Sequence, residues 1–93
     1  MAITFHIPAP LRSYASGHAR VNLAASPATL REALEALWLV HPGLRDRIVT
    51  EQGAVREHIG VFVGKESSRY TGELSTPVAE GAQISILPAV SGG

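Results

Sequence analysis

One amphipathic helix in the first half of the chain constrains the fold more than any other feature. Thr29 and Glu32 have the spacing of a capping box, in which each side chain accepts from an N–H group at the start of a helix. Pro42-Gly43 ends the helical pattern. The residues on one face of this helix are Leu30, Ala33, Leu34, Leu37, Trp38 and His41. The sequence therefore predicts one strong helix whose Leu/Trp face packs across a sheet.

Two short strands are predicted before this helix. Residues 3–7 and 21–23 each alternate apolar and polar side chains, as half-buried strands do, and their order predicts an antiparallel hairpin. The intervening segment 11–17 is expected to be a loop whose Leu11 and Tyr14 fold back on the core.

Three more strands are predicted after the helix. Residues 58–63 are apolar enough for a central strand, residues 68–70 form a short strand after a turn at 64–66, and residues 82–87 form the last strand. The order of elements predicts one α+β domain over residues 1–87. A single helix covers only one face of a sheet, so the other face is expected to meet water or a partner.

Composition excludes several classes of function. Eight basic and eight acidic side chains cancel, which predicts no binding of nucleic acid or of an anionic membrane. The absence of cysteine excludes disulfides, thiolate metal sites and thiol nucleophiles. Lys65 is the only lysine. The start of the chain has no signal-like pattern and no apolar run has membrane-spanning length, so we expect a cytoplasmic protein.

No intrinsic catalytic or metal site is predicted. The four histidines lie far apart on different elements, and no pair has metal-ligand spacing; they are His6, His18, His41 and His58. No serine lies in a Gly-x-Ser-x-Gly elbow, and the glutamates are scattered. Residues 60–67 superficially resemble a phosphate loop, but a hairpin turn is the better interpretation because the spacing is wrong and no helix follows.

The end of the chain is its one distinctive reactive feature. The last strand stops at Pro88, because proline has no N–H for a sheet ladder, and the chain ends on Gly92-Gly93. The tail 88–93 would reach roughly 20 Å when extended, and its glycines could enter a narrow slot. A frayed terminus is the plain alternative. Adenylation by ATP would activate the terminal carboxylate, and a sulfur donor could then displace AMP to leave a thiocarboxylate. This chemistry would belong to partner enzymes.

Several motifs together resemble the MoaD/ThiS group of ubiquitin-like sulfur carrier proteins, over nearly the whole chain. The specific ones are Pro77-Val78-Ala79-Glu80-Gly81 and the ending Ile86-Leu87-Pro88-Ala89-Val90-Ser91-Gly92-Gly93; the weaker ones are residues 7–12, 29–30 and 62–64. The resemblance implies a β-grasp fold, with a mixed sheet of four to five strands and one main helix across one face. It also implies a carrier that is not an enzyme, or a small subunit of a synthase complex.

The resemblance also implies roles for particular residues. Gly93 would be the site of adenylation and thiocarboxylation, with Gly92 as its slot-fitting neighbour. The arm that threads into a partner's active site would be Pro88, Ala89, Val90 and Ser91. Phe62 is among the apolar side chains that would dock partners on the uncovered sheet face.

The implied partners are an adenylyltransferase of the MoeB/ThiF type, which uses ATP, a sulfur donor and a sulfur-accepting synthase. The chain itself would bind no cofactor. The ending and the length of the loop 42–57 are more similar to the cysteine-synthesis (CysO) and MoaD types of carrier than to the thiamine type. The receiving pathway stays open among molybdopterin, cysteine and thiamine synthesis.

Two other functions remain open from the sequence. A ubiquitin-like modifier would use the same adenylate, which a target lysine would attack to form an isopeptide bond with Gly93. A β-grasp interaction module would bind partners through its sheet face and have no tail chemistry.

Overall fold

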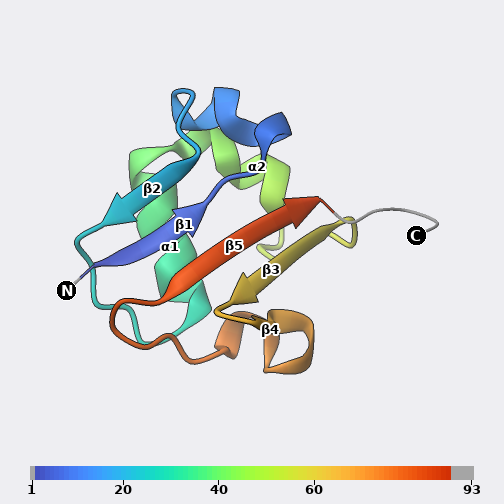
Figure 1. Cartoon of the computed structure of the whole chain (residues 1–93). Coiled ribbons are helices and arrows are strands. Elements are labelled where there is room, and N and C mark those ends of the chain that lie inside the picture. Colours follow the sequence, from blue (N-terminus) through green and yellow to red (C-terminus); the bar gives the residue numbers. More distant parts are fainter. Residues whose placement is uncertain (1, 89–93) are drawn as a thin grey trace.

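The computed structural model describes residues 2–88, which form a mixed five-stranded sheet with one long helix packed across one face (Figure 1). This confirms the predicted β-grasp architecture. In chain order the elements are β1 (Ile3–His6), η1 (Ala9–Ala15, a 3₁₀ helix), β2 (Arg20–Leu23), α1 (Leu30–Val40), η2 (Pro42–Leu44), α2 (Arg45–Ile48), β3 (Ile59–Val63), β4 (Glu66–Ser67), η3 (Ser68–Tyr70), η4 (Glu73–Ser75) and β5 (Gln83–Pro88). Within residues 2–88, no helix has the length and apolar character needed to cross a membrane.

The strands lie in the order β2-β1-β5-β3-β4. The antiparallel hairpin of β1 and β2 is confirmed, with Phe5 opposite Val21. The central strand is β5, which pairs in parallel with β1 and antiparallel with β3. Residues 58–63, predicted to be central, form β3 as an interior strand between β5 and the two-residue β4, whereas the middle position of the sheet belongs to β5.

Helix α1 begins as the sequence predicts. The Thr29 hydroxyl accepts a hydrogen bond from the Glu32 N–H at 3.4 Å. The Glu32 carboxylate accepts from the N–H of Ala28 at 3.0 Å, one residue earlier than in the usual capping box. The helix buries Leu30, Ala33, Leu34 and Leu37 against the sheet, while Trp38 and His41 are half-buried.

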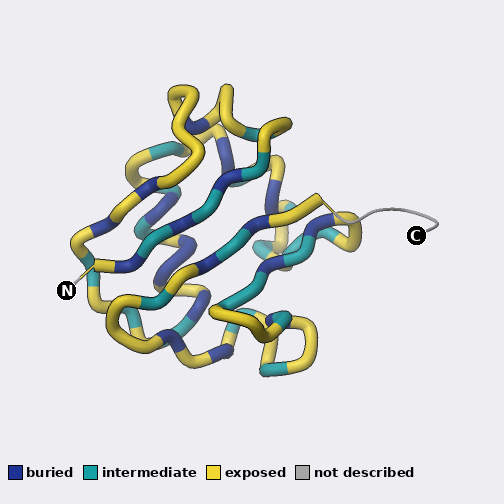
Figure 2. Tube along the Cα trace, viewed as in Figure 1, coloured by how far each residue is buried: buried dark blue, intermediate teal, exposed yellow. Residues whose placement is uncertain are grey.

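The core lies between α1 and one face of the sheet. Alternate residues of β1, β3 and β5 face the helix, so that buried and more exposed positions alternate along each strand (Figure 2). The buried side chains from these strands are Ile3, Phe5, Ile59, Val61, Ile84 and Ile86.

Two local predictions were wrong. Residues 9–15 form the helix η1 in place of a loop, because the prolines that suggest a loop also suit the start of a helix. The prediction that Leu11 folds back on the core is confirmed, since this half-buried side chain packs against it. Ala15 is the buried residue of the segment, whereas Tyr14 is 37% exposed and lies against the Arg47 guanidinium. The short fourth strand is 66–67 in place of 68–70, because the turn has only two residues and η3 begins directly after the strand.

Candidate functional site

The last described residue, Pro88, ends the central strand β5. It is exposed and stands opposite Ile59, so β5 (Gln83–Pro88) begins and ends one residue later than the predicted strand 82–87. A proline is tolerated there because no further ladder hydrogen bond is required at the end of a strand. The sites predicted at Gly93, Gly92, Ser91, Val90 and Ala89 lie outside the described residues and stay predictions.

The uncovered face of the sheet is polar over β1 and β2 and more apolar over β3 and β5. Over β1 and β2 it carries polar side chains, among them Thr4, whose hydroxyl donates to the Asn22 amide oxygen at 2.8 Å. Over β3 and β5 the same face carries the half-buried Phe62 and Leu87, which is 46% exposed. Phe62, the predicted docking residue, therefore lies on the apolar side of the uncovered face.

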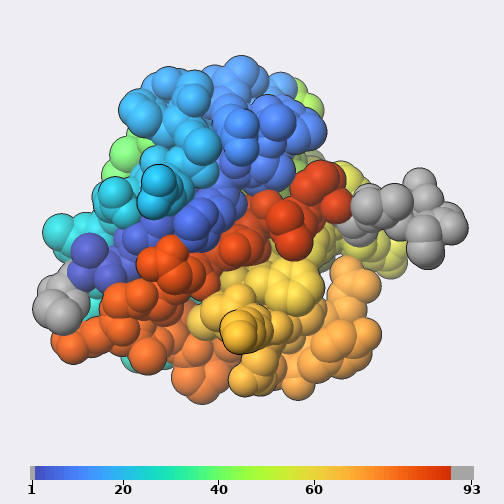
Figure 3. All heavy atoms as spheres, viewed as in Figure 1, coloured from blue at the N-terminus to red at the C-terminus, as the bar shows by residue number. Residues whose placement is uncertain are grey.

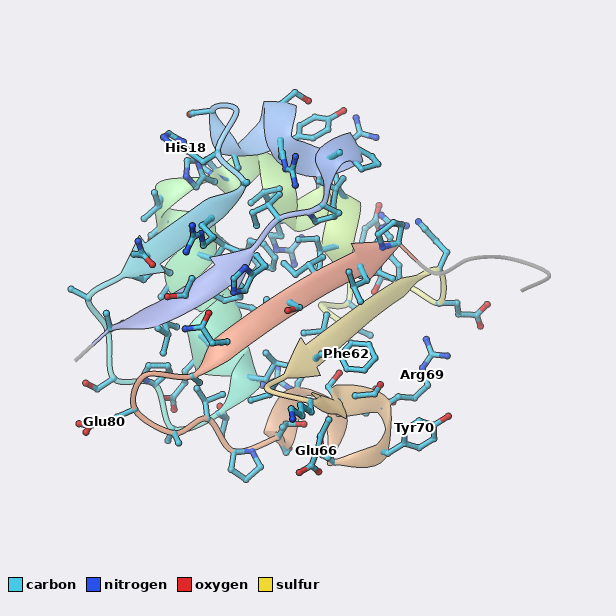
Figure 4. All side chains as sticks on the ribbon, in the orientation of Figure 1. His18, Phe62, Glu66, Arg69, Tyr70 and Glu80 are labelled. Carbon is cyan, nitrogen blue, oxygen red and sulfur yellow. The ribbon has the colours of Figure 1, made fainter. Side chains whose placement is uncertain are left out.

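A hollow of about 360 Å³ lies between this apolar side and the helix η3. We call it the Gly60 hollow. Its lining includes Gly60, Phe62, Arg69, Tyr70, Leu87 and Pro88. Gly60 stands opposite Leu87 in the β3–β5 register. In Figure 4, Phe62 lies beside Arg69 and Tyr70 on the β3 side of the sheet. The hollow therefore borders the point at which residues 89–93 continue from β5.

A second hollow, of about 260 Å³, lies on the other side of the same strand end. We call it the arginine hollow, because Arg12 and Arg20 line it together with His6, Ser85 and Leu87. The Arg12 Nε donates to the carbonyl of Ile7 at 3.0 Å, which fixes its guanidinium. The end of β5 thus has an apolar hollow on one side and a cationic hollow on the other. Figure 3 shows β5 running between β1 and β3 on this face.

The hairpin after β3 and the histidines are the other features that the sequence singled out. Residues 60–67 form the predicted hairpin, with Gly64 at φ +64° in its turn. No group of three metal-ligating side chains occurs among residues 2–88. The histidines are less dispersed than predicted, since the rings of His18 and His41 lie 6.4 Å apart between centroids. Sequence spacing missed this pair because the fold brings the loop before β2 beside the end of α1.

Sequence reasoning found Phe62 but missed the residues around it. Gly60 and Leu87 alternate with buried residues, so their strand periodicity could have placed them on the same face as Phe62. The positions of Arg12, Arg20 and Arg69 depend on two 3₁₀ helices and on the strand order, for which the sequence gives no local signal.

Three comparisons place the chain among known proteins. The model of the ThiS family matches residues 5–93. The sulfur carrier protein CysO of Mycobacterium tuberculosis is 33% identical over 95 residues, which span all of both chains. CysO in the crystal structure of the Amycolatopsis orientalis BexX/CysO complex superposes with a TM-score of 0.86 at 35% identity, covering 98% of this chain and 99% of that one. Small archaeal modifier protein 1 of Haloferax volcanii is 35% identical over 66 residues, or 71% of each chain.

Proposed function

This chain belongs to the ThiS family, and on that premise we propose that it is a sulfur carrier whose cargo is held as a thiocarboxylate on Gly93. The observation that carries the proposal is the extent of the similarity. It spans the whole of the CysO relatives, and the family match includes the final Gly92-Gly93. The fold is consistent with this role, because the central strand β5 ends between two hollows.

The chemistry requires two steps at the terminal carboxylate. An oxygen of the carboxylate attacks the α-phosphate of ATP, which forms an acyl-adenylate and releases pyrophosphate. A sulfide-level sulfur then attacks the acyl carbon, the new C–S bond replaces the C–O bond to AMP, and no net oxidation takes place. Glycine suits this position because it has no side chain to block a narrow active-site channel.

The proposed partners supply the ATP-binding site and the sulfur for the two steps. An adenylyltransferase of the MoeB/ThiF type would bind ATP and activate Gly93, and a sulfur donor would load it. Residues 89–93 extend at most about 18 Å from Pro88, so both enzymes must bind close to the end of β5. The proposed acceptor is a synthase of the cysteine-forming type, which the similarity to CysO favours over molybdopterin and thiamine synthases.

Intact-mass spectrometry tests the proposal. The chain would be coexpressed with the adenylyltransferase encoded nearest to it and with a sulfur source. We expect a mass increase equal to the replacement of one oxygen by sulfur, absent from a control that lacks Gly93. No such increase with several adenylyltransferases that load their own carriers would contradict the proposal. The loaded chain, offered to the three synthase types, should lose its sulfur to the cysteine-forming one.

The similarity to small archaeal modifier protein 1 favours a second candidate, conjugation of Gly93 to lysines of other proteins. A Ser91→Arg variant would make this visible, because trypsin would then leave only Gly92-Gly93 on each modified lysine. Peptides with this remnant in lysates of cells that express the variant would support a modifier. Their absence, in cells where the carrier is loaded with sulfur, would leave the sulfur carrier as the function.

A further inference from the structure

One edge of the sheet is open to pairing with another chain. Strand β2 is an outermost strand and pairs only with β1 among residues 2–88, whereas the opposite edge is the two-residue strand β4 (Figure 1). We propose that β2 receives an extended, acidic segment of a partner protein, which adds to the sheet as a sixth strand. The inference goes beyond the proposed function, because it assigns a second binding surface that is not the end of β5.

The backbone of β2 presents unpaired groups along this edge. The N–H of Ile7 donates to the carbonyl of Ala19 at 2.8 Å, which fixes the phase of the β1–β2 ladder. Hydrogen-bonded and non-hydrogen-bonded pairs alternate along an antiparallel ladder, so Val21 directs its N–H and C=O groups toward β1. The same groups of Arg20 and Asn22 point away from the sheet, and they have no backbone partner within residues 2–88. Two donors and two acceptors are therefore available to an added strand.

A hollow of about 240 Å³ lies at the start of this edge. We call it the histidine hollow; its lining consists of His18, Arg20, Val21, Asn22 and His41. The two imidazole rings lie 6.4 Å apart between centroids, and Figure 4 shows His18 beside the start of β2. The Nδ1 of His18 donates to the carbonyl of Ala15 at 3.0 Å, so this ring is held in place and its Nε2 remains for a ligand.

The charges in the histidine hollow define the chemistry of the partner segment. Its described lining contains one guanidinium, from Arg20, and two imidazoles, but no carboxylate. A carboxylate suits all three groups, because it accepts from the guanidinium and favours the protonated imidazoles, in which both nitrogens donate. The same guanidinium disfavours a metal cation between His18 and His41. We therefore expect Asp or Glu at the end of the segment that reaches the start of β2.

The position of β2 leaves the end of β5 accessible. Strands β2 and β5 lie on opposite sides of β1, and neighbouring strands are about 4.8 Å apart, so an added strand would stand roughly 14 Å from β5. A partner on this edge can thus hold the chain while enzymes act on Gly93. A second copy of the chain is the competing occupant, but it would bring another Arg20 and His18 to the same edge, where like charges disfavour pairing.

A displayed peptide library tests this edge with a matched pair of variants. Random peptides would be selected on the wild-type chain and counter-selected on Asn22→Pro. Proline removes the outward N–H of residue 22 and spares the ladder to β1, whereas Asn22→Ala loses the same side chain and keeps that N–H. We expect enriched peptides with Asp or Glu, whose binding falls at least tenfold on Asn22→Pro and little on Asn22→Ala. Equal binding to the two variants, or enrichment of basic peptides, would overturn the proposal.

A second measurement needs only the wild-type chain and a selected peptide. Each peptide N–H would be methylated in turn. Because alternate residues of an added strand face β2, the loss of affinity should recur at every second residue. Amide hydrogen exchange at Arg20 and Asn22 should also slow in the complex. Loss of affinity without this alternation, or unchanged exchange at both amides, would refute strand addition even if the proline variant failed to fold.

Two further variants test the histidine hollow. His41→Gln and Arg20→Glu should each weaken binding of the peptide several-fold, and Arg31→Glu, on α1, is the charge control. Since Arg20 also lines the arginine hollow, His41→Gln is the decisive variant, and unchanged binding there would remove the hollow from the proposal.

The adenylyltransferase shows whether the two surfaces are separate. Saturating peptide should leave its KM for the carrier nearly unchanged, whereas competition would overturn the separation of β2 from the end of β5. Absence of loading in the wild-type chain without peptide bears on the proposed function alone. Light scattering that shows a dimer in the wild type, lost in Asn22→Pro, would assign the edge to a second copy of the chain.

Discussion

Replacement of Gly60 by valine should stabilise the fold while it fills the hollow. Glycine gives the unfolded chain extra conformational freedom, and its removal at a compatible position is worth about 0.4–1 kcal/mol. Valine is also favoured in strands, on a scale that spans roughly 1 kcal/mol. Position 60 is compatible because it is extended and its Cβ contacts are no shorter than 3.6 Å. We expect the free energy of unfolding to rise by about 1 kcal/mol.

Thermal unfolding followed by circular dichroism measures this effect. For a domain of this size, 1 kcal/mol corresponds to a rise in Tm of about 4–8 °C. Gly64→Val is the matched contrast, because Gly64 has φ +64° in the β3–β4 turn although no atom lies within 4 Å of the added Cβ. Valine there adopts a strained conformation that costs roughly 1–2 kcal/mol, so its Tm should fall. If Gly60→Val and Gly60→Ala both lowered the Tm, the reasoning that position 60 accommodates a side chain would be refuted.

Three further predictions concern the helix, the core and the uncovered face. Thr29→Ala removes the hydrogen bond to the Glu32 N–H and should lower the free energy of unfolding by about 1 kcal/mol in urea titrations; no change would mean that the cap is redundant. Phe5→Ala should cost about 3–5 kcal/mol in the same assay, since Phe5 is fully buried, whereas Leu39→Ala, at a residue that is 87% exposed, should stay within about 0.5 kcal/mol. Leu87→Ala should weaken binding to the adenylyltransferase by about tenfold, as loss of an interface anchor does. Leu39→Ala is the control, and equal binding of the two variants would count against docking at the end of β5.

The sequence predicts those parts of the fold that depend on local periodicity. The alternation of Ile3, Phe5 and Ile7 identified β1, and the spacing of Thr29 and Glu32 identified the start of α1. Such patterns are informative because each residue's neighbours in sequence are also its neighbours on one face. The order of the strands does not follow from them, because the pairing of β5 with both β1 and β3 depends on contacts between distant residues.

The candidate site was predictable only in part for the same reason. The alternation in β3 placed Phe62 on the face of the sheet that the helix does not cover. The motif at the end of the chain indicated Gly93. One side of the Gly60 hollow, in contrast, is formed by η3, a segment that the sequence pattern predicted to be a strand. The proximity of Arg12 to the end of β5 depends on η1, which was interpreted as a loop. Short 3₁₀ helices have weak sequence signals, so functional groups that they position are found only in the structure.

The parallel pairing of β1 with β5 also has a consequence for the order of folding. Phe5 pairs with Val21 in the hairpin and with Ile84 in β5, so the second pairing closes a loop roughly five times longer. That difference costs about 1.4 kcal/mol more in loop-closure entropy, which favours formation of the hairpin before β5 docks. We therefore expect the pairing of β5 with β1 to be the last step in the formation of the sheet, after the shorter connections have paired β1 with β2 and β3 with β5. The arginine hollow, which residues of β1 and β5 line together, would then form only in chains that have completed folding, because Ser85 reaches His6 only at that final step.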